Sequence, residues 1–176
     1  DIELFSLMLP LLVLVLAVGS GARAFAGEED AGRLELVLAY PVRRRNAVLA
    51  KGLAVAVEVL AVSLAAGLAL VLFDPIVGLD LPGARLAAAL GTLAGLGILF
   101  GWLALAVGAA LGSRALAIGV PAALGAGGYL VNGLHGLAGW LDPFRVLSPF
   151  WLVGSSPLQT GVRGWGFLVV LLLAAL

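Results

Sequence analysis

The chain has 176 residues, of which 62% are hydrophobic and 11% charged, and its mean hydropathy is +1.17. Soluble domains contain about 45–50% apolar and about 25% charged residues, so this chain has too few charges to cover a surface that faces water. Its 10 basic and 10 acidic side chains cancel, which excludes the basic excess needed to bind nucleic acid, and the absence of cysteine excludes disulfides and thiolate metal sites.

The apolar runs, taken in chain order, predict an all-α fold: a polytopic transmembrane helical bundle. A helix needs about 20 apolar residues to cross the hydrocarbon core, and the runs 4–22, 53–73, 86–111 and 115–141 reach that length. A last run, 165–176, is too short for a complete span, so we expect the chain to be part of a longer polypeptide. No run alternates apolar and polar residues as the strands of a membrane barrel do.

The basic residues fall into two groups, which set the orientation. One group lies in the stretch 23–51 and at Arg114, and the other group is Arg85, Arg145 and Arg163. The positive-inside rule assigns the first group to the cytoplasm, so the first run passes from outside to inside.

The segment 28–40 predicts a short helix at the cytoplasmic surface. It opens with Glu28, Glu29 and Asp30, and the positive end of a helix dipole favours acids at an N-terminus. The apolar residues that follow have helical spacing: Ala31, Leu34, Val37 and Leu38. Pro41 cannot continue a helix and marks the end. By physics alone, a solvated connector anchored to anionic lipid by its basic residues explains the pattern equally well.

The stretch 28–51 resembles the loop between the second and third helices of ABC-2 type permeases. That family shows acidic residues, a glycine, a Leu-Glu step, a leucine, a Pro-Val pair and then basic residues. The matching residues here are Glu28, Glu29, Gly32, Leu34, Glu35, Leu38, Pro41, Val42, Arg43 and Lys51. The resemblance continues in the tight turn at 113–114, and the run 147–151 looks like the segment before the last helix of bacterial antibiotic-exporter permeases.

The resemblance implies a partial ABC-2 transmembrane domain of the type V exporter kind, covering about helices 2–6 of a six-helix unit. The segment 28–40 would contain the coupling helix that docks on an ATPase subunit, and 142–164 would form an outer re-entrant or interfacial segment. The residues implied in coupling are Glu28, Glu29, Gly32, Arg33, Leu34, Glu35, Val37, Leu38 and Pro41.

The partners that the resemblance implies are an ABC ATPase subunit, in two copies, and a second permease unit, as a homodimer or a fused half. The setting would be the bilayer of the bacterial inner (plasma) membrane. The only lysine, Lys51, does not follow the glycine pattern of a P-loop, so we expect no ATPase site and no cofactor in this chain. ATP and Mg would be bound by the partner. The predicted function is the permease subunit of an ATP-driven exporter of a drug, antibiotic or other hydrophobic compound.

The alternative prediction is an ion-coupled secondary transporter that uses Glu58. An acid inside a membrane helix is costly and is therefore a candidate functional group, although pairing with Lys51 or exposure to water would also explain it. A membrane enzyme or structural anchor ranks last, because catalysis needs clustered polar groups and His135 is the only histidine. The glycine pairs 91/95, 97/101 and 108/112 have the small-xxx-small spacing of close helix packing.

Overall fold

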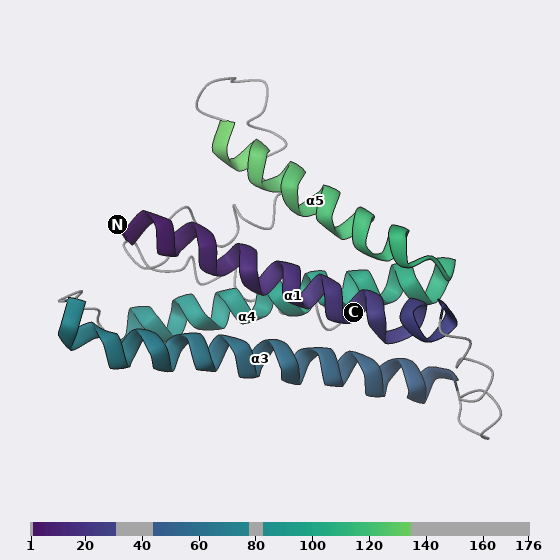
Figure 1. The fold of residues 1–176 in the computed structure, drawn as a ribbon, viewed down its shortest axis with the longest axis horizontal. Coiled ribbons are helices and arrows are strands. Elements are labelled where there is room, and N and C mark those ends of the chain that lie inside the picture. The colour runs from purple at the N-terminus through teal and green to yellow at the C-terminus, as the bar shows by residue number, and fades with distance from the viewer. Residues whose placement is uncertain (1, 31–43, 78–82, 135–176) are drawn as a thin grey trace.

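The computed structural model describes residues 2–30, 44–77 and 83–134 (Figure 1). The described residues form four helices: α1 (Ile2–Asp30), α3 (Arg44–Val77), α4 (Gly83–Leu111) and α5 (Arg114–Leu134). Only Gly112 and Ser113 among them are not helical. The predicted all-α fold class is therefore confirmed for the described part of the chain.

Three stretches are long and apolar enough to cross a membrane: Arg45–Phe73 in α3, Leu86–Leu111 in α4 and Arg114–Val131 in α5. A shorter apolar stretch, Met8–Ala24, lies within α1. The 29 residues of α1 give it a length of about 43 Å at about 1.5 Å per residue, which exceeds the roughly 30 Å hydrocarbon core.

Two helices extend beyond the apolar runs that predicted them. The first run was expected to end at residue 22, but α1 continues to Asp30, and α3 begins at Arg44 instead of residue 53. The α1 extension contains Arg, Ala and Glu, and the α3 extension contains Arg, Ala, Leu and Lys. All are good helix formers, and neither extension contains proline. Hydropathy marks where a helix meets water, whereas the backbone stays helical past that point.

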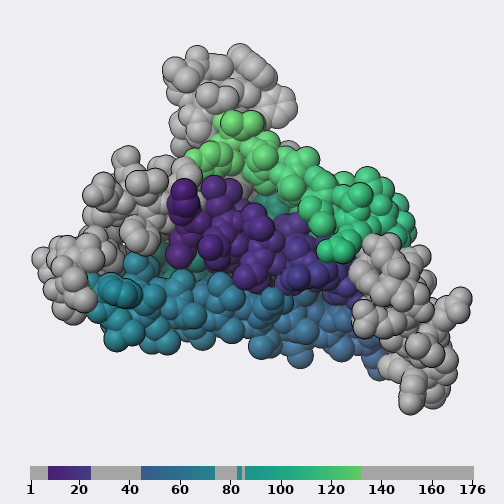
Figure 2. All heavy atoms as spheres, in the orientation of Figure 1, coloured from purple at the N-terminus to yellow at the C-terminus, as the bar shows by residue number. Residues whose placement is uncertain are grey.

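The helix α4 lies at the centre of the described bundle. In its most apolar stretch 56% of the residues are buried, against 22% in α3 and 11% in α5. One hydrophobic cluster joins α4 to α1 and α3, and a second joins α4 to α1 and α5. Figure 2 shows α1 between α3 on one side and α5 on the other, over the face of α4.

Two glycines of α4 receive side chains from α3. A Cβ on Gly97 would lie 2.7 Å from Val59 Cγ1, and a Cβ on Gly101 would lie 2.7 Å from Val55 Cγ1. The pairing order is reversed along the two helices, so α3 and α4 are antiparallel. Of the three predicted glycine pairs, 97/101 therefore forms a groove that the valines of α3 fill.

The contact between α1 and α4 is closer still. A Cβ on Gly21 would lie 2.1 Å from the carbonyl oxygen of Gly101, so the two backbones touch at this crossing. Val13 of α1 lies opposite Gly97, and Ala17 opposite Gly101, in the same order along both helices. The helices α1 and α4 are therefore parallel. This is expected when successive spans alternate in direction, because one span, α3, separates α1 from α4 in the chain.

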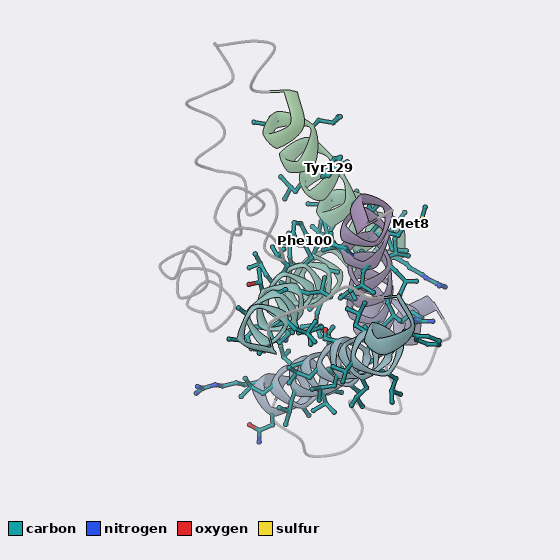
Figure 3. All side chains as sticks on the ribbon, turned by 90° about the vertical axis from the view of Figure 1, so that its left-hand side faces the viewer. Met8, Phe100 and Tyr129 are labelled. Carbon is teal, nitrogen blue, oxygen red and sulfur yellow. The ribbon has the colours of Figure 1, made fainter. Side chains whose placement is uncertain are left out.

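A two-residue turn joins α4 to α5. Gly112 has φ 62°, a left-handed conformation that ends α4 without strain because glycine has no Cβ. Ser113 Oγ then accepts a hydrogen bond from the backbone N–H of Leu116 at 3.4 Å, which caps the start of α5. From this turn α5 leans away from the other helices (Figure 3), and the ring of buried Phe100 of α4 faces Gly125 of α5.

Large apolar side chains cover the outside of the described helices. On α3, Leu53, Leu64 and Leu72 are 65%, 63% and 72% exposed. A water-soluble surface would not carry an uninterrupted row of such residues, whereas hydrocarbon is a favourable environment for it. The exposed surface thus supports membrane spans independently of helix length.

Candidate functional site

The helices α1 and α3 meet at one end of the bundle, and the segment 31–43 joins them there. The basic side chains that the structure describes, Arg23, Arg45, Lys51 and Arg114, all lie toward this end, where α1 and α4 finish and α3 and α5 start (Figure 1). We call it the basic end. By the positive-inside rule it is the cytoplasmic end.

The residues implied in coupling divide into two sets. Glu28 and Glu29 belong to the last turn of α1, which ends at Asp30. The separate surface helix was expected to begin at Glu28. Gly27 is the one glycine in the part of α1 beyond residue 22, and one glycine costs about 1 kcal/mol, too little to stop a helix of this length. The remaining predicted residues lie outside the described residues: Gly32, Arg33, Leu34, Glu35, Val37, Leu38 and Pro41.

Two hydrogen bonds tie α3 to its neighbours at the basic end. Lys51 Nζ donates to the backbone carbonyl of Ala24 in α1. Trp102 Nε1 of α4 donates to the carbonyl of the next α3 residue, Gly52, at 2.9 Å. We call these two bonds the clasp. Arg23, at the same end, instead donates within α1, from Nε to the Gly19 carbonyl at 3.1 Å.

Glu58 lies at the middle of the α3 span. It follows Arg45 by 13 residues and precedes Phe73 by 15, which puts it about 20 Å from either end at about 1.5 Å per residue. Its side chain is exposed and lies two turns from Lys51, on nearly the same side of α3. The same face carries exposed alanines one and two turns away, at Ala54, Ala61 and Ala65. A partner helix could therefore approach α3 closely here.

The interior of the described bundle contains hydroxyl groups but no charge. Its buried polar residues are Ser20, Ser63 and Thr92. Thr92 Oγ1 donates to the Ala88 carbonyl at 2.8 Å, a bond within its own helix, and Ser63 Oγ has no hydrogen-bond partner in the described part of the chain. No ionisable side chain is therefore buried among the residues whose side chains the structure describes. Nor does any group of three potential metal ligands occur within residues the structure describes.

The sequence did not single out Gly21 or Trp102. Gly21 lies in the run Gly19-Ser20-Gly21-Ala22, a concentration of small residues that marks a close helix crossing. Trp102 sits in an otherwise apolar run, where an indole N–H needs an acceptor. Composition shows that such a partner must exist, but only the packing of α3 on α4 identifies it as Gly52.

Comparison with known protein families identifies a family of membrane proteins to which the chain is similar. A protein-family model described as ABC-2 family transporter protein matches residues 1–140, which include all four described helices. No curated protein and no solved structure is significantly similar to the chain.

The match confirms the resemblance that the stretch 28–51 carries. The membrane domain of this family lacks an ATPase site, its members carry no cofactor in the membrane subunit, and they generally pair with an ABC ATPase subunit. The chain is a multi-pass membrane protein that belongs to the ABC-2 transporter family, as a membrane permease.

Proposed function

We propose that the chain is the permease subunit of an ATP-driven exporter in the bacterial inner membrane, and that it moves a drug, antibiotic or other hydrophobic compound. The observation that carries the proposal is the joining of α1 to α3 at the basic end by the segment 31–43, within a stretch that resembles a coupling loop. By the positive-inside rule the adjoining ends of α1 and α3 face the cytoplasm, the side on which an ATPase subunit would bind. ATP and Mg would be bound by that subunit, in two copies.

A second permease unit, as a homodimer or fused half, would cover the outer face of α3. A carboxylate at the bilayer centre costs about 2.5–3.5 kcal/mol, so an exposed Glu58 facing lipid is unfavourable. The alanines beside it would let another helix approach closely and shield the carboxylate. The substrate class rests on the run 147–151, which resembles the segment before the last helix of bacterial antibiotic-exporter permeases.

The test of the proposed function is the energy source of transport. Inside-out vesicles containing the full-length permease and its ATPase subunit should accumulate a hydrophobic fluorescent dye when ATP is added. Accumulation should stop when the ATPase subunit is replaced by a variant that binds but does not hydrolyse ATP. Dye uptake driven by a proton gradient without ATP would contradict the proposal.

Glu58→Gln separates this function from an ion-coupled transporter. We expect the variant to keep ATP-driven transport within about twofold of the wild type, because the neutral amide can still be shielded by a partner helix at lower desolvation cost. An ion-coupled mechanism that protonates Glu58 would lose transport completely. Transport rate should be measured against ATP concentration in both proteins, with Ser63→Ala as the control for a nearby polar change on the buried face of α3.

A further inference from the structure

We propose that Lys51 and Trp102 are positioning residues, and that the clasp passes movement of the segment 31–43 into the membrane bundle. The inference rests on the proposed function, because it requires an ATPase subunit to act on that segment. It assigns a role to two side chains that the resemblance to coupling loops leaves without one.

The clasp ties two consecutive residues of α3 to two different helices. Lys51 reaches across to the α1 carbonyl of Ala24, which is 27 residues earlier in the chain, so the bond closes the loop that contains 31–43 at its base. Gly52 accepts from Trp102 of α4 at 2.9 Å. A Cβ on Gly52 would lie 3.6 Å from Trp102 Nε1, an ordinary van der Waals distance, so the indole packs directly on this residue.

The remaining contacts of α3 with α4 differ in kind. Val55 and Val59 fit against the glycines of α4 through dispersion contacts, which are not directional. A hydrogen bond loses strength steeply when its geometry changes, so the clasp adds a directional constraint to this packing. The clasp therefore fixes the register of α3 at the basic end, close to where a docking ATPase would push.

A rigid connection between α1, α3 and α4 at the basic end determines which helices move when the ATPase subunit displaces the segment 31–43. With the clasp intact, displacement of 31–43 moves the starts of α3 and the ends of α1 and α4 as one body. Without it, α3 can tilt or turn alone at the basic end, and the motion is absorbed before it reaches the opposite side of the membrane. The alternative is that Lys51 merely anchors α3 at the membrane surface, as a basic residue near a helix end often does.

The experiment measures distances at both ends of the bundle in the full-length permease, reconstituted in nanodiscs with its ATPase subunit. The 176 residues contain no cysteine, so pairs of spin labels can be introduced at exposed positions. Labels at Arg45 and Leu116 report on the basic end, and labels at Leu72 and Leu130 report on the opposite end. Distances are compared without nucleotide and after trapping with ATP and vanadate.

Four variants separate transmission from anchoring. Lys51→Met and Trp102→Phe each remove one donor of the clasp and keep most of the side-chain volume. Lys51→Arg keeps a cationic donor and should rescue. Arg23→Met is the matched control, since it removes a positive charge at the same end whose hydrogen bonds are to Gly19 and Ser20 of its own helix.

We expect trapping to change both label pairs in the wild type, Lys51→Arg and Arg23→Met. In Lys51→Met and Trp102→Phe the basic-end pair should still respond, while the response of the opposite pair is lost. A normal response of the opposite pair in both variants would overturn the proposed role of the clasp. So would loss of that response in the control, Arg23→Met. If Lys51→Met does not fold, by size-exclusion profile and co-purification with the ATPase, Trp102→Phe decides. A wild type that neither retains the ATPase nor responds to ATP would instead overturn the proposed function.

Discussion

Gly21→Ala is expected to destabilise the bundle by about 1–3 kcal/mol, because the new Cβ would overlap the backbone where α1 crosses α4. That Cβ would lie 2.1 Å from the carbonyl oxygen of Gly101 and 3.1 Å from the Ala104 side chain. No rotamer change can relieve a clash with a backbone oxygen, so the two helices must separate. The loss would spread, since the same crossing buries Ala17 and Ala22 of α1 completely.

The measurement is the midpoint of thermal unfolding in detergent, followed by size-exclusion chromatography of the heated protein. For a chain of this length the midpoint should fall by about 2–12 °C. Gly19→Ala is the matched control on the same helix, because nothing lies within 4 Å of its added Cβ. It should be neutral or slightly stabilising, as alanine favours a helix over glycine. Equal midpoints for the two variants would show that α1 and α4 do not cross at Gly21.

Leu34→Asp combined with Leu38→Asp should abolish co-purification of the permease with its ATPase subunit. The two leucines share the apolar face predicted for the segment 28–40, and apolar anchors at a protein interface contribute about 2 kcal/mol or more each. Placing a carboxylate at both positions should weaken binding by about 4 kcal/mol, roughly a thousandfold. The transmembrane bundle should stay intact, because the changes fall outside α1 and α3.

The control for this variant is Leu36→Asp, which makes the same change on the opposite face of the same predicted helix. We expect it to retain the ATPase in the pull-down, and we expect all variants to show the wild-type thermal midpoint. Retention of the ATPase by the double variant would show that the apolar face does not dock. Loss in Leu36→Asp as well would indicate that any acid in the segment disrupts its structure.

The helices were predictable from the sequence because two strong signals, apolar length and the near absence of charge, both require them. Their ends were less predictable, since α3 begins at Arg44 and α1 continues through Glu28 and Glu29. In those stretches hydropathy falls while helix propensity stays high. An apolar run reports hydropathy only, so it does not show where the helix ends. The turn at Gly112 and Ser113 was predictable because a left-handed glycine and a capping serine are local features.

The site could be predicted only where its chemistry is local. The stretch 28–51 has a residue pattern that identifies its family, whereas the clasp joins residues 50 positions apart, Gly52 and Trp102, through the packing of α3 on α4. Glu58 shows the same limit. Its charge was visible in the sequence, but its level in the bundle follows from packing, because its neighbour Val59 lies against Gly97 near the middle of the α4 span, Leu86–Leu111.

Photo-crosslinking from the segment 28–40 tests the central claim most directly. A photoreactive amino acid at Val37, on the predicted docking face, is compared with the same group at Leu72, which is exposed at the opposite end of α3. After irradiation of membranes containing the full-length permease and its ATPase subunit, we expect a covalent permease–ATPase product from Val37 and none from Leu72. A product from Leu72, or the absence of one from Val37 while the two subunits still co-purify, would contradict docking through this segment.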